Sequence, residues 1–379
     1  MLNSYAKTGI VSAPESPVSV SIGLLARNEA EGIRETLDSL FEQTILNEAN
    51  RRKCLLEIIC IVNGSEDATA SLVSEYFKQN PLRTGCTARV INLFEAGKIN
   101  AWNQFVHRYS TESAKYLILM DADIVFGHPA TLWNLCSELE TQPNAEVATG
   151  EPVKDLSLKP SPSLRERLSL STSRMTQKSG AQMTGQLYCI RSETARRIHL
   201  PRQLAACEDG LIKCLVCTDF GNVTPQPERI VKTDQASHVF KAYVTLNEIL
   251  QNQRRQMIGQ TYIHVLVDQF IPSLTSYQRS DLKTVLTQLD EDEPDWLRKL
   301  IKAHLARTRY FWRMFPGLTT FRMRRLNALK KRDHLRHMPA AMVGSLFSLV
   351  AAWMAASSLR KGETDIWPSK VPTNLKSGN

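Results

Sequence analysis

The stretch that decides the fold is YLILMDAD at residues 116–123. Its first five residues form an apolar run typical of a buried strand, and the run ends in two carboxylates, Asp121 and Asp123. Carboxylates so close together repel each other unless a cation joins them. Mg²⁺ and Mn²⁺ prefer oxygen ligands and would also neutralise a diphosphate, so the pair predicts a metal site. The alternative is two solvated aspartates in a turn.

Further apolar runs of strand length lie on both sides of this stretch, at residues 18–26, 55–62, 88–93, 146–152 and 185–190. Helical patterns lie between the earlier runs, at 30–43, 67–79, 98–109 and 129–140. This alternation predicts an α/β fold with a Rossmann-like, mostly parallel sheet that carries helices on both faces. The pattern is helical from residue 245 to about 359, with a loop entering a helix at 203–216 before it.

The chain has 379 residues, enough for two domains or for one large domain with an appendage. We expect a polar N-terminal segment at 1–17 without the apolar core of a secretory signal, an α/β domain at 18–240 and a helical region at 241–379. The formal net charge is +9, but residues 301–379 hold 15 Lys and Arg against 3 Asp and Glu. A basic tail of this kind indicates an anionic membrane or nucleic acid as its partner.

One apolar segment, residues 338–359, contains no charged side chain. It has the length of a membrane span, but its serines make it only moderately apolar. It is equally compatible with an interfacial helix held at anionic lipid, and the alternative is a helix buried against the main domain. The cysteines lack a second pair to match Cys214 and Cys217, so we expect them to be structural, in a reducing cytosolic setting.

Polar residues follow the ends of three predicted strands, where ligands bind in sheets of this kind. Ala26-Arg27-Asn28-Glu29 ends the first strand, and Asn63 follows the second. Lys98 opens the helix after the third and can approach an anionic ligand. A helix cap at Asn28 and a turn at Asn63 are the alternatives at these positions.

A second acidic pair, Glu208 and Asp209, opens a helical pattern. One of these carboxylates could act as a general base and the other could orient it. The alternative is a capping residue followed by an acid in the first helical turn.

In this order, the motifs resemble the family 2 glycosyltransferases with the GT-A fold. The matching pieces are Ala26–Glu29, Asn63-Gly64-Ser65 with Asp67 and Thr69, Gly97-Lys98 with Ala101 and Asn103, Asp121-Ala122-Asp123, Gly185–Tyr188 and Glu208-Asp209. The likeness covers residues 18–240. The Asp-x-Asp at a strand end together with the later Glu-Asp is its most specific part.

The resemblance implies a role for each residue. Asp123 would bind the Mn²⁺ or Mg²⁺ ion that grips a sugar nucleotide, with Asp121 on the ribose or the metal and His238 as a further metal ligand. Asp209 would deprotonate an acceptor hydroxyl, with Glu208 beside it, and attack would invert the anomeric centre. The residues expected around the nucleotide sugar are Ala26, Arg27, Asn28, Glu29, Asn63, Lys98, Asp121, Gln251 and Arg254.

Two positions depart from the family pattern. Val62 stands where the family often has an aspartate that helps to hold the base of the nucleotide. Arg255 stands in place of the Trp of a Gln-x-x-Arg-Trp element, which here reads Gln251-Asn252-Gln253-Arg254-Arg255. The missing Trp argues against a processive polysaccharide synthase.

The leading hypothesis is therefore a non-processive, inverting glycosyltransferase that uses a UDP-sugar and a divalent metal. We expect a hydroxyl acceptor, lipid-linked or membrane-associated, in cell envelope glycan synthesis at the cytoplasmic face of the membrane. The alternatives are a cytoplasmic enzyme with a small soluble acceptor, a nucleic-acid-binding protein and a degenerate GT-A domain without catalysis. No specific nucleic acid partner is expected, because the basic stretch at 322–336 contains no recognised binding module.

Overall fold

The structure is a computed structural model that describes residues 19–48, 55–158, 183–243, 245–308, 310, 314–315 and 331–362. The polar N-terminal segment at 1–17 lies outside the described residues. Residues 159–182, between the predicted strands at 146–152 and 185–190, also lie outside them.

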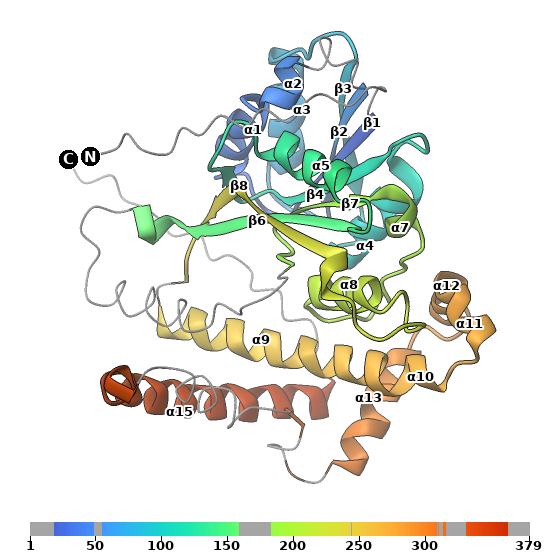
Figure 1. The fold of residues 1–379 in the computed structure, drawn as a ribbon, viewed down its shortest axis with the longest axis vertical. Coiled ribbons are helices and arrows are strands. Elements are labelled where there is room, and N and C mark those ends of the chain that lie inside the picture. Colours follow the sequence, from blue (N-terminus) through green and yellow to red (C-terminus); the bar gives the residue numbers. More distant parts are fainter. Residues whose placement is uncertain are drawn as a thin grey trace.

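The described residues form one sheet of eight strands in the order β3-β2-β1-β4-β7-β6-β8-β5 (Figure 1). The strands are β1 (Ser19–Ala26), β2 (Leu55–Asn63), β3 (Cys86–Leu93), β4 (Tyr116–Asp121), β5 (Ile124–Phe126), β6 (Val147–Lys154), β7 (Leu187–Arg191) and β8 (Ile230–Phe240). Neighbours from β3 to β4 are parallel, as are β6 and β8, whereas β4/β7, β7/β6 and β8/β5 are antiparallel. The sheet is therefore mixed, with its parallel half at the N-terminal side.

Alternate residues of the central strands enter two separate apolar cores, one on each face of the sheet. Leu117 and Leu119 of β4 belong to one core, and Ile118 and Met120 belong to the other. Helices α1 (Ile33–Phe41), α2 (Thr44–Glu48), α3 (Thr69–Gln79) and α5 (Thr131–Thr141) pack in the second core. Helix α4 (Lys98–Gln104), its continuation Phe105–Tyr109, α7 (Ser192–Arg196) and α8 (Glu208–Cys217) pack in the first. The predicted fold class, an α/β GT-A sheet covered on both faces, is confirmed.

Beyond the sheet the chain is helical, as predicted. The elements are α9 (Leu246–Val265) with its continuation Leu266–Phe270, α10 (Ile271–Ser273), α11 (Ser276–Ser280), α12 (Leu282–Asp292), α13 (Trp296–Arg307) and α15 (Lys331–Lys361). A capping box starts α9, because Thr245 accepts a hydrogen bond from the Glu248 N–H and Glu248 bonds back to the Thr245 N–H. In Figure 1, α9 lies beneath the sheet domain and α15 lies beneath α9.

The first core continues through these helices without a break. It contains Tyr188 of β7, Tyr262 of α9, Leu297 of α13 and Ala355 of α15. The described part of the chain contains no helix that is both long and apolar enough to cross a membrane.

Three details differ from the prediction. The first helix begins at Ile33, after a turn, and not at residue 30. The short strand β5 was not predicted, because three residues carry little periodic signal. His238, which we expected to follow the last strand-like stretch, lies within β8, because the strand runs on to Phe240.

Candidate functional site

The parallel strands β2, β1 and β4 end at one edge of the sheet. The register places Ala26 of β1 beside Val62 of β2, and Leu25 beside Asp121 of β4. Because the carboxyl ends of neighbouring parallel strands meet at the same edge, the polar residues that follow them are brought together.

Hydrogen bonds tie the loop after β1 to the loop after β2. The Asn28 N–H donates to Ser65 Oγ at 3.0 Å, and Asn28 Oδ1 accepts from the Glu66 N–H at 2.9 Å. The Glu29 N–H donates to Thr69 Oγ1 at 2.9 Å. Asn28 has a φ of 53°, a left-handed conformation that Asn tolerates better than most residues. The alternative interpretation of Asn28 as a helix cap is wrong, because α1 begins several residues later.

Asn63 holds the strand ends to the third loop. Its Nδ2 donates to the Ala26 carbonyl oxygen at 2.9 Å, and its Oδ1 accepts from the Gly97 N–H at 3.1 Å. Gly97 directly precedes Lys98 and α4. Arg27 directly follows Ala26, and its Nε is buried and has no hydrogen-bond partner among the described residues.

Lys98 is the centre of the site. Its Nζ lies 2.6 Å from Asp121 Oδ1 and 2.8 Å from Glu208 Oε1, and it donates to the Gly185 carbonyl oxygen at 3.0 Å. Burial alone would lower the pKa of Lys98, but the charges of Asp121 and Glu208 raise it above its usual value. Lys98 is therefore a buried, charged ammonium that joins the end of β4 to the start of α8.

The two acids at the start of α8 differ in their surroundings. Burial opposes ionisation of Glu208, but the charge of Lys98 lowers the pKa of Glu208 below its usual value. Burial and the charge of Glu208 raise the pKa of Asp209 to about 6. The charge of Lys98 and hydrogen bonds from the N–H groups of Gly210 and Gly185 lower it by less. Glu208 is therefore the ionised counter-ion of Lys98. Asp209 is the carboxyl whose pKa lies closest to neutrality of the two, as suits a general base.

Asp121 is a site residue whose expected contact with the ribose or a metal ion stays a prediction. It faces Lys98, while burial and the charges of Asp123 and Glu208 raise its pKa to about 7 against the opposing effect of Lys98. The described residues contain no group of three His, Cys, Asp or Glu side chains placed to hold a metal ion.

His238 lies in β8 opposite Phe126 of β5, the strand that begins directly after Asp123. It is fully buried, its Nε2 lies 3.3 Å from Gln186 Oε1, and its Nδ1 has no partner among the described residues. Burial lowers the pKa of His238 to about 4, against the charge of Asp123, so the imidazole is neutral. A neutral, incompletely bonded His near a carboxylate is a suitable partner for a cation.

Gln251 and Arg254 of α9 are hydrogen-bonded to each other, and Arg254 also binds α15. Arg254 Nη1 donates to Gln251 Oε1 at 3.0 Å, and its Nε and Nη2 donate to Ser358 Oγ of α15 at 3.1 and 2.6 Å. These contacts fix α15 on α9. A role of the two residues toward the nucleotide sugar stays a prediction.

The site also contains Gly185 and Gln186, to which the sequence analysis assigned no role. A Cβ added at Gly185 would lie 2.9 Å from Glu208 Oε1 and 3.3 Å from Asp209 Cβ, so a side chain at this position would press on both acids. Gln186 contacts His238 through its side chain and accepts from the Asp121 N–H through its carbonyl oxygen, at 2.9 Å. The available signal was the Gly-Gln pair directly before a predicted strand.

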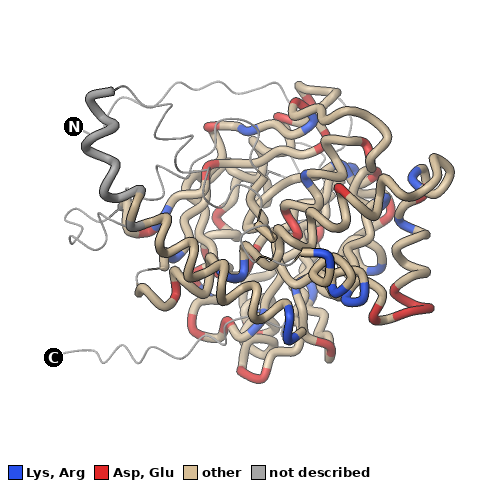
Figure 2. Tube along the Cα trace, turned by 90° about the horizontal axis from the view of Figure 1, so that it is seen from below, with Lys and Arg blue, Asp and Glu red and all other residues tan. Residues whose placement is uncertain are grey.

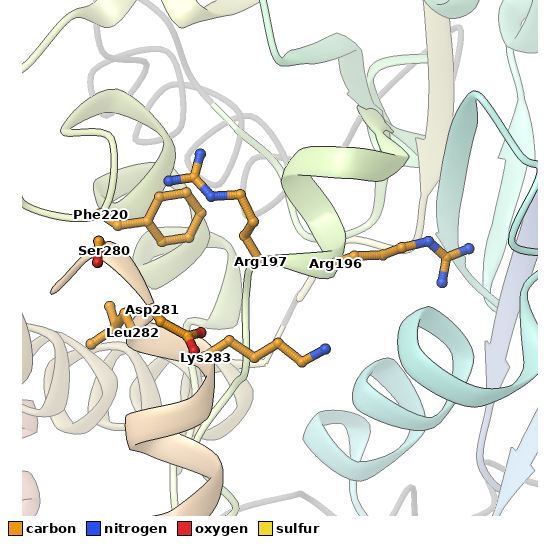
Figure 3. A pocket seen from close by; sticks show the side chains of 7 residues that line it. All are labelled: Arg196, Arg197, Phe220, Ser280, Asp281, Leu282 and Lys283. Atoms are coloured by element: carbon orange, nitrogen blue, oxygen red, sulfur yellow. The ribbon is translucent and has the colours of Figure 1, made fainter. Parts of the chain in front are cut away.

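A separate cavity of about 100 Å³ lies between the sheet domain and the helical region (Figure 3). Its lining consists of Arg196, Arg197, Phe220, Ser280, Asp281, Leu282 and Lys283. The Arg197 guanidinium stacks 4.1 Å from the Phe220 ring centre and pairs with Asp219 at 3.1 Å. Because Arg197 is engaged in this way, we interpret the cavity as a packing gap.

Residues 21–193 match the model of the family described as "Glycosyl transferase family 2". This stretch runs from β1 into α7 and contains the strand-end loops, Lys98, Asp121 and Asp123. This part of the chain is therefore similar to a family 2 glycosyltransferase domain, which supports a glycosyltransferase that uses a nucleotide-sugar donor.

Two solved proteins illustrate what the chain is similar to. One is S. aureus TarS 1–349, solved with UDP, at 13% identity and a TM-score of 0.42 over 91% of this chain and 92% of that chain. The other is glucosyl-3-phosphoglycerate synthase from Mycobacterium tuberculosis, solved with Mn²⁺, UDP and phosphoglyceric acid. It matches at 18% identity and a TM-score of 0.41 over 65% of this chain and 78% of that chain. Among curated proteins, none matches the chain.

Proposed function

We propose that this glycosyltransferase moves a sugar from a UDP-sugar to a hydroxyl group of a lipid-linked or membrane-associated glycan, with inversion and one sugar at a time. Its place would be the cytoplasmic face of the membrane, in the synthesis of a cell envelope glycan. The donor would lie on the loops after β1, β2 and β4, where Asn28, Asn63 and the unpartnered Arg27 Nε are held.

The observation that carries the proposal is the position of Lys98 between Asp121 and Glu208. Lys98 binds one acid of the second pair and so gives the two acids different tasks. Glu208 stays charged and keeps Lys98 in place. Asp209 is the next residue, and its pKa, raised to about 6, suits it to take a proton near neutral pH.

In the reaction, Asp209 takes the proton of the acceptor hydroxyl as the oxygen attacks the anomeric carbon. The bond between that carbon and the diphosphate oxygen breaks, and its electron pair leaves with UDP. Attack on the face opposite the leaving group inverts the configuration. The positive charge of Lys98 near the strand ends favours binding of the anionic donor.

The residues present fit a divalent cation at Asp123 and His238. The unpartnered, buried Nδ1 of a neutral His238 and the carboxylate of Asp123 are donors that Mn²⁺ accepts. When bound, such a cation supplies charge that stabilises the departing diphosphate. Asp121 faces Lys98, so its proposed part is in positioning the donor.

A thermal-shift panel tests the donor site, with UDP, GDP, CDP and their sugar conjugates, each with Mn²⁺ or with EDTA. A ligand at 100 times its dissociation constant stabilises a protein by about 2.7 kcal/mol. We expect a shift with UDP and Mn²⁺ that Asp123→Ala abolishes. Equal shifts with EDTA would contradict the metal, and no shift with any nucleotide would favour a degenerate domain or a nucleic-acid-binding protein.

Transfer is tested with Asp209→Asn, which should bind the donor as the wild type does and form no product. Retained turnover would place the base elsewhere. A lipid-linked acceptor is tested against small soluble sugars in the same assay. Product formed only with soluble sugars would favour the cytoplasmic alternative.

A further inference from the structure

The outer surface of α15 carries an apolar stripe. Met342, Leu346, Val350 and Trp353 follow one another at spacings of four, four and three residues, which places them on one side of a helix. They are 68, 62, 42 and 63% exposed. The stripe extends for about 16 Å along the helix axis at 1.5 Å per residue. Exposed apolar residues in such an ordered row indicate a contact surface.

The opposite side of α15 is buried in the protein. Ala351, Ala352, Ala355 and Leu359 are at most 2% exposed, and small alanines let α15 approach α9 closely. Arg254 of α9 adds two hydrogen bonds to Ser358. Because this side is fixed on α9, the stripe is the side that residues 342–361 present to a partner, and the helix would lie along that partner's surface.

The charges of α15 lie at its two ends. The helix begins with three basic residues and one acid, Lys331, Arg332, Asp333 and Arg336, and ends with the exposed Arg360 and Lys361. It has no charged residue from 337 to 359. Figure 2 shows the molecule from below, the side on which α15 lies in Figure 1. Residues 301–379 carry 15 Lys and Arg against 3 Asp and Glu. An apolar row between basic ends suits a surface that is apolar inside and anionic outside.

We propose that the stripe of α15 is the surface by which the enzyme docks on an anionic lipid bilayer, with α15 lying in the interface. Trp353 suits this place, because indole combines an apolar body with a polar N–H that stays at the headgroups. A second copy of the chain fits less well, since two equally basic regions repel each other. The proposal deepens the membrane-linked acceptor proposed above, on which it rests, and it names the surface that reaches that acceptor.

The test is co-sedimentation of the full chain with vesicles of phosphatidylcholine, with or without phosphatidylglycerol. We expect binding to the vesicles with phosphatidylglycerol and weaker binding in high salt. Leu346→Glu and Trp353→Glu should each weaken binding about tenfold or more, because each replaces a buried apolar contact by a charge. Tyr277→Glu is the matched control, since Tyr277 of α11 is 86% exposed and lies off the stripe.

Three outcomes would overturn the proposal. The first is that the wild type binds neither kind of vesicle. The second is that Trp353→Glu and Tyr277→Glu bind vesicles equally well. The third is that the wild type binds no lipid but forms a dimer, which Trp353→Glu converts to a monomer. UDP-dependent thermal shifts of the same variants keep the two proposals apart. A Trp353→Glu protein that loses vesicle binding and keeps its UDP shift supports docking, whereas vesicle binding without any UDP shift contradicts only the proposed transfer.

Discussion

Replacing Asp290 by Asn tests how firmly the helical region holds the segment that leads to the acidic pair. Asp290 lies in α12 and is 2% exposed. Its carboxylate accepts hydrogen bonds from His199 Nε2 at 2.8 Å, the Arg202 N–H at 2.9 Å and Trp296 Nε1 at 2.8 Å. His199 and Arg202 belong to the segment between α7 and α8, so this one carboxylate joins that segment to α12 and α13.

The magnitude follows from the number of bonds. A hydrogen bond to a charged group contributes about 1.5–3 kcal/mol. The amide introduced by Asp290→Asn would keep one acceptor oxygen but would turn its NH₂ group toward donors that need an acceptor. We expect this substitution to lower the free energy of unfolding by about 2–4 kcal/mol, because at least one buried donor is left unpaired.

The effect has a predictable pH dependence. Burial alone would raise the pKa of Asp290, but the hydrogen bonds from His199, Trp296 and Arg202 lower it below its usual value. A carboxyl whose pKa is lowered in the folded state stabilises the fold above its unfolded pKa, about 3.9, and loses that effect as the pH falls through the folded pKa. The difference between the wild type and Asp290→Asn should therefore shrink in acid.

Urea unfolding followed by circular dichroism at pH 7 and at pH 3 measures both effects, because pH 3 lies below the unfolded pKa. Asp292→Asn is the control, because Asp292 lies two residues further along α12 and is exposed. The reasoning is refuted if Asp290→Asn and Asp292→Asn unfold at the same urea concentration at pH 7.

Three further predictions concern the site itself. Transfer by the wild type, measured as kcat/KM, should rise with pH around a midpoint of about 6, because Asp209 must lose its proton to act as the base; a flat profile would contradict this role. Lys98→Met should lower the free energy of unfolding at pH 8 by about 3–5 kcal/mol, because the carboxylates that face Lys98 lose their counter-ion. Part of this loss should disappear at lower pH, where the carboxylates take up protons. Urea unfolding at the two pH values measures the difference. Gly259→Ala should destabilise the protein by about 1–3 kcal/mol, since the new Cβ would lie 2.7 Å from the Ala206 carbonyl oxygen, whereas Gly32→Ala has open space and should change the urea midpoint little.

Periodicity was sufficient to predict the parallel half of the sheet. The run that ends at Asp121 became β4, and the runs before it became β1, β2 and β3. The apolar runs of β1 and β4 are buried on both faces, as expected of central parallel strands, whereas β3 is a half-exposed edge strand. The antiparallel half was harder. Strand β5 has three residues, and β8 alternates only weakly along its length, with burial of Ile230, Thr233 and His238.

The sequence predicted which residues belong to the candidate site, but it could not predict which of them contact one another. Lys98 was expected near a nucleotide, whereas the structure pairs it with Asp121 and Glu208, which are distant in sequence. No local pattern encodes such a contact, because it depends on how β4 and α8 approach α4. The residues alone left open which of the two acids beside Gly185 is the base. The resemblance named Asp209, and the position of Lys98 supports that assignment.

The part of the chain that matches the family ends at residue 193, before the second acidic pair. The loops proposed for the donor lie within this match, whereas the proposed base, Asp209, lies beyond it. The segment that carries Asp209 is held from one side by Lys98 and from the other by α9, where Gly259 allows the close approach of Cys207. If the proposed roles hold, we expect donor binding to depend on the part that matches the family and the geometry of the base to depend also on the helical region. We accordingly expect acceptor specificity to reside in residues 194–362, and exchanging α9 or α15 with a relative should change the acceptor before it changes the nucleotide.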